Sequence, residues 1–186
     1  LAYQRFAPFG GKRVPGVITI HNMAFQGCFD AKVFPSLGLP DAAWSIDGAE
    51  FHGSVSLLKA GLMTADAITT VSPSYAAAIR TPEFGMGLEG VIASRDDCLS
   101  GIVNGIDTEV WNPAHDPDLP QSYSARTLSR RAANKRALEA EFGLDEGDGP
   151  LFIAVSRLTW QKGMDVLADC IDHLVGIGGR LALLGT

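Results

Sequence analysis

The sequence predicts an α/β fold with parallel sheets, arranged in two parts. Apolar runs of strand length alternate along the chain with segments of helical periodicity. Near-continuous apolar runs at 151–156 and 181–184 flank an amphipathic stretch at 164–175, which is typical of a right-handed parallel crossover. Three prolines and several aspartates interrupt this alternation within 105–124. That segment is therefore predicted to be a linker between two sheet systems.

The first part begins with turn-like residues at 8–11 and a strand over 14–20. A helix is predicted over 54–65, because its apolar side chains recur on one face. Short β-branched runs predict two further strands, and a proline at the first helical position marks another helix start. The remaining predicted elements are a strand at 67–71, a helix from Ser72 to Arg80, a helix within 85–94, and a strand at 102–103 that ends at Asn104-Gly105.

The second part should contain a helix over 125–142, stopped by Gly143, and then a break at 147–150. The crossover of strand, helix and strand follows. On its helix, Leu167, Ile171 and Leu174 face one way together with a cysteine. We expect the chain to be a piece of a longer protein, because the run at 181–184 is typical of a buried strand that has just reached its loop.

Composition excludes several classes of protein. The 186 residues are 46% hydrophobic, which suits a packed core, and the net charge is 15 − 21 = −6. This acidic balance disfavours a nucleic-acid binder or a basic membrane-surface protein, and no apolar run approaches the roughly 20 residues of a membrane span. Three widely spaced cysteines predict free thiols in a reducing cytoplasm. The four histidines show no metal-binding spacing, so no metal site is predicted.

The strongest local chemistry lies at 156–163, where the sequence reads SRLTWQKG between a buried strand and a helix. Arg157 and Lys162 bracket this loop, and the free N–H groups of the following helix point into the same space. Such a place favours a phosphate, and Gly163 allows close approach of the backbone. The alternative interpretation is two solvated cations on the surface. The spacing is not that of a Walker loop.

Two further polar groups follow predicted strands. His21 and Asn22 sit at the carboxyl end of the first strand, where open α/β sheets bind ligands. A histidine there can act as acid, base or hydrogen-bond donor, or it can be structural. Asn104 ends another strand, although Asn-Gly is also an ordinary turn. The cations of the fourth helix are predicted to form a solvated face; they are Arg126, Arg130, Arg131, Lys135 and Arg136.

Taken together, these segments resemble the bacterial glycogen synthase and plant starch synthase family of retaining glycosyltransferases. The order and spacing of the matching stretches make the resemblance specific. They are HNMAFQG at 21–27, SLLKAGL at 56–62, TVSPSYA at 70–76, GLEGV at 87–91, VNGID at 103–107, VWNP at 110–113, NK at 134–135, SRLTWQKG at 156–163 and LALLG at 181–185.

The resemblance implies the GT-B architecture, in which two Rossmann-like domains face a cleft. It assigns 1–103 to the later part of the acceptor-side domain, and 104–186 to the crossover and start of the nucleotide-sugar domain. The family transfers glucose from a nucleotide sugar, usually ADP-glucose in bacteria, to the non-reducing end of an α-1,4-glucan, with retention. The expected partners are therefore ADP-glucose and glycogen in the cytoplasm. The 186 residues alone are expected to be inactive.

The resemblance also implies roles for single residues. Arg157 and Lys162 correspond to the pair that holds the donor diphosphate and stabilises the leaving ADP. No metal or other cofactor is then expected, because two fixed cations do that work. Gln161 lies between them as a substrate-binding residue. His21 corresponds to the active-site histidine near the donor glucose, with Asn22 beside it; Asn104 corresponds to a residue of the cleft.

The sequence departs from the family pattern in three places. Trp160 stands where small or polar residues are common, and the amino-terminal lysine-glycine-glycine motif and the late acidic motif are absent. Two alternatives stay open. One is another retaining GT-B enzyme that uses a UDP-sugar or makes sucrose, since the 156–163 loop is partly shared with such enzymes. The other is a nucleotide- or glycan-binding module without catalysis.

Overall fold

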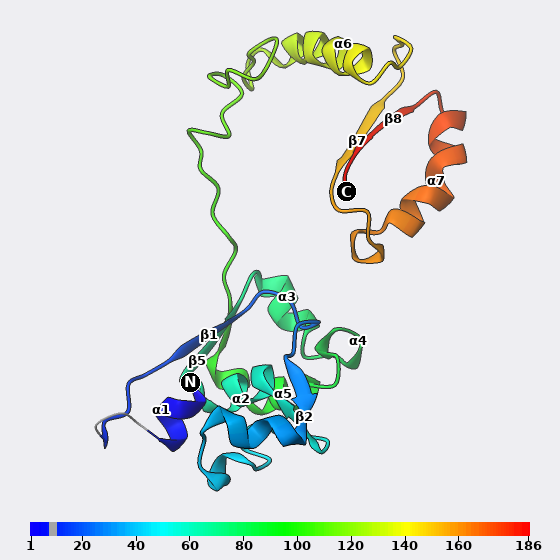
Figure 1. The fold of residues 1–186 in the computed structure, drawn as a ribbon. Helices are drawn as coiled ribbons and strands as arrows, with labels where there is room; N and C mark the ends of the chain where they lie inside the picture. Colours follow the sequence, from blue (N-terminus) through cyan, green and yellow to red (C-terminus); the bar gives the residue numbers. More distant parts are fainter. Residues whose placement is uncertain (8–10) are drawn as a thin grey trace. The chain divides into compact units, whose positions relative to one another are not determined.

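The structure is a computed structural model that describes residues 1–7 and 11–186. The chain forms two compact units, Leu1–Gly105 and Ile106–Thr186, and each is described by itself. The turn predicted at 8–11 lies almost wholly outside the described residues. Figure 1 follows the elements of both units in chain order.

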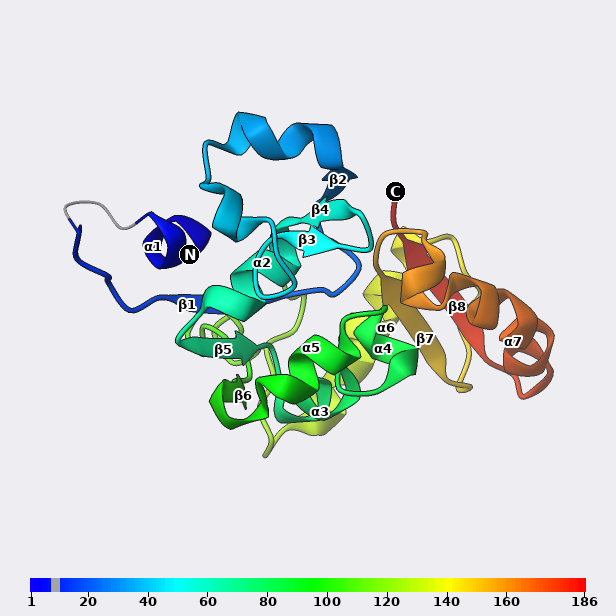
Figure 2. The same ribbon diagram turned by 90° about the horizontal axis from the view of Figure 1, so that it is seen from below.

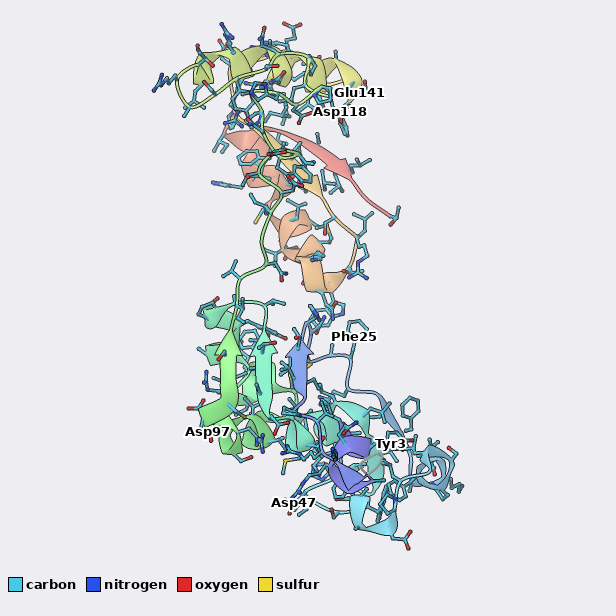
Figure 3. The ribbon with its side chains drawn as sticks, turned by 90° about the vertical axis from the view of Figure 1, so that its left-hand side faces the viewer. Tyr3, Phe25, Asp47, Asp97, Asp118 and Glu141 are labelled. Carbon is cyan, nitrogen blue, oxygen red and sulfur yellow. The ribbon has the colours of Figure 1, made fainter. Side chains whose placement is uncertain are left out.

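The main sheet of the first unit has three parallel strands, two of which lie within the segments 14–20 and 67–71 where the sequence predicts strands. They are β1 (Val17–Ile20), β5 (Ala67–Thr70) and β6 (Leu99–Gly101), in the order β1-β5-β6. Ile18 pairs with Ile68, and Ile68 with Leu99, so the apolar side chains of the three strands lie in one row. The three arrows point toward the same edge in Figure 3. That carboxyl edge carries the sequence motifs discussed below.

Short helices surround this sheet, and hydroxyl side chains cap two of them. Ser56 accepts a hydrogen bond from the N–H of Lys59, and Ser72 accepts one from the N–H of Tyr75. Figure 2 shows α1 beside α2, and the two helices are in contact. The helices are α1 (Ala2–Phe6), α2 (Leu57–Thr64), α3 (Pro73–Ala78), α4 (Pro82–Gly85) and α5 (Glu89–Ser94).

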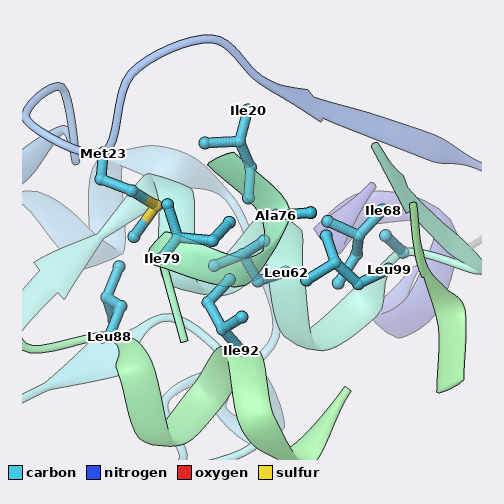
Figure 4. Close-up of a cluster of buried hydrophobic side chains, with 10 residues drawn as sticks. Ile20, Met23, Leu62, Ile68, Ala76, Ile79, Leu88, Ile92 and Leu99 are labelled. Atoms are coloured by element: carbon cyan, nitrogen blue, oxygen red, sulfur yellow. The ribbon is translucent and has the colours of Figure 1, made fainter. Parts of the chain in front are cut away.

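A hydrophobic core joins these helices to the sheet (Figure 4). Leu62 of α2 and Ile92 of α5 are fully buried, and a Cβ on Gly61 would lie 2.5 Å from Cδ1 of Ile18. The glycine therefore lets α2 approach β1 closely. The buried members of the core are Ile20, Met23, Leu62, Ala65, Ile68, Ala76, Ile79, Leu88, Ile92 and Leu99.

A second, antiparallel sheet was not expected from the sequence. It contains β2 (Cys28–Asp30), β4 (Ser54–Ser56) and β3 (Glu50–Phe51), in the order β2-β4-β3. The helix predicted over 54–65 is therefore wrong for its first three residues. His52 and Gly53 adopt positive φ angles of 49° and 77°, which turn the chain back into a hairpin. The helix begins only after the Ser56 cap.

The strand predicted at 102–103 is also displaced. The pairing ends at Gly101, and the side chains of Ile102 and Val103 are 60% and 68% exposed. The β-branched pair suggested a strand, but the buried partner of Ile68 is Leu99, three residues earlier. The hydrophobic residue that matches the sheet face thus decides the register.

Lys59 is a buried lysine of α2, with 3% of its surface exposed. Its Nζ donates to the backbone oxygens of Glu50 at 2.7 Å and Gly48 at 3.2 Å, and also to those of Ile46 and Ser45. Burial lowers the pKa of this ammonium, although the charges of Glu50 and Asp47 oppose the shift. These hydrogen bonds anchor the 45–50 loop to the ammonium group of Lys59 on α2.

The second unit contains the predicted crossover. β7 (Leu151–Val155) pairs in parallel with β8 (Arg180–Leu184), and α7 (Met164–Gly176) connects them along one side (Figure 1). α6 (Arg131–Glu141) precedes the crossover. It begins six residues later than the prediction of 125, because Leu128–Arg130 form a separate 3-10 turn.

A solvated face was predicted for the cations of the helix that corresponds to α6, and this prediction is wrong for Lys135 and Arg136, which are partly buried and hydrogen-bonded. Glu139 is fully buried and accepts hydrogen bonds from Arg136 and Arg180. Burial raises the pKa of its carboxyl, but the hydrogen bond and charge of Arg136 and the charge of Arg180 outweigh this and hold the pKa below its usual range. Lys135 donates to the carbonyls of Gly147 and Gly149 at 2.9 and 2.6 Å. A charged network therefore fixes the break at 147–149.

Candidate functional site

His21 directly follows β1, whose last residue, Ile20, is buried at 2% exposure. The strand thus buries Ile20 and presents His21 to solvent at the carboxyl edge of the sheet. Asn22 turns the chain there, because its Oδ1 accepts the N–H of Ala24 at 2.9 Å. This bond uses the Oδ1 of Asn22, so its Nδ2 can donate a hydrogen bond to a ligand.

Three other parts of the first unit hold the 21–27 loop. The hydroxyl of Tyr75, on α3, accepts the N–H of Met23 at 3.1 Å. The Nε2 of Gln26 donates to the carbonyl of Met86 at 2.9 Å, in the turn between α4 and α5. The carbonyl of Gln26 accepts the N–H of Leu58, on α2, at 3.0 Å. The loop that carries His21 is therefore preorganised.

Asn104 lies three residues beyond the end of β6 and is exposed. The strand order places β5 between β1 and β6, so His21 and Asn104 follow strands about 10 Å apart, two strand spacings. The structure thus places both residues beyond the same edge of one sheet. Asn104 occurs outside regular structure, in a run of exposed residues.

The 156–163 loop occupies the equivalent place in the second unit, between β7 and α7. Its first residues continue the sheet by two backbone bonds, from the N–H of Ser156 to Leu184 at 3.1 Å and from that of Leu158 to Thr186 at 3.0 Å. A single 3-10 turn, Trp160–Lys162, follows, and Gly163 then turns into α7 with a φ of 70°. This geometry makes the prediction of a strand–loop–helix junction correct.

The 156–163 loop presents polar side chains to solvent. Arg157, Gln161 and Lys162 are all exposed, and neither cation pairs with a carboxylate within the described residues. Among the residues that the structure describes, no side chain caps the N-terminus of α7. The Oγ1 of Thr159 is buried and has no hydrogen-bond partner in the described part of the chain. Two cations, a helix N-terminus and an orphaned hydroxyl together suit an oxyanion.

Two glycines that sequence reasoning missed make these edges possible. A Cβ on Gly185 would lie 2.1 Å from the carbonyl oxygen of Ser156, and a Cβ on Gly101 would lie 2.3 Å from that of Ser72. In both units, the glycine stands at the end of one strand and touches the turn that follows the neighbouring strand. For Gly185, a position at the carboxyl end of the apolar run 181–184 was the available signal; Gly101, between Ser100 and Ile102, offered no such signal.

The described residues hold neither a membrane span nor a cluster for a metal. No helix among them combines the length and apolar character needed to cross a bilayer. No group of three or more histidines, cysteines or acidic residues in the same residues is placed to bind a metal ion. The three cysteines have free thiols.

The structure therefore defines a class of protein: an α/β chain of two units, with polar loops at the carboxyl edges of parallel strands. Comparison with known proteins identifies the family. The family model described as the starch synthase catalytic domain matches residues 2–94. The chain belongs to this family.

Relatives and solved structures agree with that assignment. A glycogen synthase of Novosphingobium aromaticivorans is 67% identical over all of this chain and 39% of that protein, and one of Rhizobium tropici is 58% identical over 98% of this chain and 38% of that protein. The catalytic domain of starch synthase IV from Arabidopsis thaliana, bound to ADP and acarbose, superposes with a TM-score of 0.85 at 34% identity. This match covers 97% of the present chain and 38% of that structure. The fold class is GT-B, as predicted, and the chain spans about two fifths of the length of these relatives.

Proposed function

We propose that these residues form part of a glucan synthase of glycogen biosynthesis, which transfers glucose from ADP-glucose to the non-reducing end of an α-1,4-glucan with retention. The loop at 156–163 carries the proposal, because it joins two cations that have no carboxylate partner in residues 1–7 and 11–186 to the N-terminus of a 13-residue helix. The glycogen synthases among the relatives, and the solved starch synthase IV domain bound to ADP, support this choice of substrates. The proposed location is the cytoplasm.

The proposed division of labour follows the sequence motifs. Residues 1–103 would belong to the acceptor-side domain, and residues 104–186 to the crossover and the start of the nucleotide-sugar domain. In this proposal His21 and Asn22, in the acceptor-side domain, position the donor glucose, and Asn104 lines the cleft. The hydrogen-bonded loop around His21 supports the assignment, since a positioning group must be held firmly.

In the second part, Arg157 and Lys162 hold the diphosphate of the donor, and Gln161 contributes a neutral donor beside them. When the bond from glucose to ADP breaks, negative charge grows on the leaving diphosphate. Two fixed cations stabilise that charge more strongly in the transition state than in the ground state, which accelerates the transfer. The helix N-terminus adds partial positive charge at the same place.

A chimera tests the proposal. In it, these 186 residues replace the matching segment of the 67% identical Novosphingobium relative. We expect the chimera to transfer labelled glucose from ADP-glucose into glycogen. If it is folded but transfers label from neither ADP-glucose nor UDP-glucose, the proposal fails and a binding module is favoured. If UDP-glucose is the only donor, the alternative GT-B enzyme is favoured.

Substitution of the cations tests the role of the loop. Arg157→Ala or Lys162→Ala in the chimera should lower kcat about 100-fold, because one stabilising group is lost from the transition state. The KM for glycogen should change little. Arg130→Ala is the matched control, since Arg130 is an exposed cation of the same unit at a distance along the chain. Unchanged turnover in both loop variants would remove the diphosphate role.

A further inference from the structure

Phe25 is an exposed aromatic residue in the loop that follows β1. Its side chain is 73% exposed, whereas Met23, two residues earlier, is fully buried. Figure 3 shows Phe25 near the end of β1, at the edge toward which the strands of the sheet point. The loop thus buries one large apolar side chain and presents the other to solvent, four residues after His21.

The backbone under Phe25 is fixed on both sides. Its own N–H donates to the carbonyl of Asn22 at 3.3 Å, and the next residue, Gln26, is bonded to Met86 through its side chain and to Leu58 through its carbonyl. The ring is therefore held in water by an ordered loop and does not lie at a frayed end. An exposed Phe side chain leaves apolar surface in water, so a partner that covers it gains the free energy of burying that surface.

The turn that contacts this loop is strained and also apolar. Met86 has a φ of 52°, a left-handed conformation that is unfavourable for a non-glycine residue, and it is 44% exposed. The hydrogen bond from Gln26 to the Met86 carbonyl joins the two segments. This bond thus joins two segments that each present an exposed apolar residue, Phe25 in the loop that begins with His21 and Asn22, and Met86 in the turn; we call these two segments the rim.

The chemistry of this rim selects a neutral sugar over an anion. The 21–27 segment contains no lysine or arginine, in contrast to the 156–163 loop. A glucosyl unit has an apolar C–H face, which packs on an aromatic ring, and hydroxyl edges, which bond to amide and imidazole groups. An exposed phenyl ring next to His21 and Asn22 supplies both kinds of contact.

We propose that Phe25 is an acceptor-binding residue, whose ring packs against a glucosyl unit of the α-1,4-glucan. The proposal rests on the proposed function and adds the residue that the acceptor contacts on this edge. Phe25 takes no part in bond breaking. It holds the acceptor chain, so its loss weakens use of the acceptor and leaves use of ADP-glucose intact.

The test compares three variants in the chimera, with maltohexaose as acceptor. Phe25→Ala should raise the KM for maltohexaose about five- to tenfold, as expected when an aromatic contact is truncated. The KM for ADP-glucose should stay within about twofold. Phe25→Tyr should restore the KM for maltohexaose. Phe29→Ala is the control, because Phe29 is a 46% exposed phenylalanine on β2, outside the loop, and should leave both constants unchanged.

A binding measurement separates this inference from the proposed function. Calorimetric titration of the chimera with maltohexaose does not depend on transfer. Weaker binding in Phe25→Ala, with the melting temperature unchanged, supports the inference even if the chimera transfers no glucose. Equal binding by Phe25→Ala and the parent overturns it. Loss of binding together with a lower melting temperature in both Phe25→Ala and Phe25→Tyr also overturns it, since Phe25 would then be a packing residue.

Discussion

The two units end their parallel strands alike but hold them in place by different means. In each, a glycine touches the turn after the neighbouring strand: Gly101 against Ser72, and Gly185 against Ser156. Among the described residues of the first unit, fifteen apolar residues are buried, whereas within 106–186 the only buried apolar residue is Ala182 in this chain, which spans about two fifths of the length of its relatives. In the second unit, the buried Glu139 pairs with Arg136 and Arg180. The same edge geometry thus occurs in a unit with an apolar cluster and in a unit with a buried charged network.

The largest effect should come from the apolar core of the first unit. Leu62→Ala in the 186-residue chain is expected to lower the free energy of unfolding by about 2–5 kcal/mol, because Leu62 is fully buried among other core side chains. Leu183→Ala in the same chain is the matched change in the second unit, where Leu183 is 40% exposed, and should cost less than about 1 kcal/mol. Urea denaturation followed by circular dichroism measures both. Equal losses would contradict the contrast between the units.

The shared glycine geometry predicts an intermediate effect. Gly185→Ala would bring a Cβ to 2.1 Å from the Ser156 carbonyl, so the backbone of the 156–163 loop must move. We expect a cost of about 1–3 kcal/mol and a lower affinity for ADP-glucose. Gly176→Ala is the control, because nothing lies within 4 Å of its Cβ position and its φ is not positive. Thermal melting and a donor titration provide the readout; an unchanged affinity for the donor would show that the loop tolerates the shift.

The smallest effect is a pH dependence at the opposite edge of the first sheet. A hydrogen bond from the N–H of Gly16, together with the guanidinium of Arg13, holds the pKa of Asp66 below its ordinary value of 3.8. A carboxyl with a lowered folded pKa contributes stability above pH 3.8 and loses it as the pH falls through the folded pKa. Asp66→Asn should therefore flatten the fall in melting temperature below pH 4. A curve parallel to that of the parent would exclude Asp66 as a source of acid sensitivity.

The sequence predicted the crossover of the second unit because local signals agreed there. β7, α7 and β8 have clear periodicity and glycine boundaries, and the structure places them within about one residue of the predicted ends. The segment 54–56 failed for the opposite reason. Val55 fits one face of a helix as well as the inner face of a strand, and only pairing with Phe29 on a distant strand decides between them.

The polar residues follow the same rule. His21 and Arg157 could be named because each stands at a predicted junction of strand and loop, and Lys162 because it ends the same loop before the predicted helix. The buried contacts of Arg136 with Glu139 could not, since an arginine three residues before a glutamate on a helix is usually a solvated pair. Arg180, forty-one residues away, turns that pair into a buried network. The role of a charged residue thus depends on partners that are distant in the sequence, and the periodicity of a helix gives no information about such partners.

The loop at 45–50 is held by Lys59, whose ammonium lies among four backbone carbonyl oxygens. In other proteins, backbone carbonyl oxygens coordinate bound alkali-metal ions such as potassium in a similar arrangement. Here the cation is covalently tethered, so it cannot exchange with the solution and has no dissociation constant. The loop is therefore expected to keep its shape whichever salt surrounds the protein, because it contains its own ion.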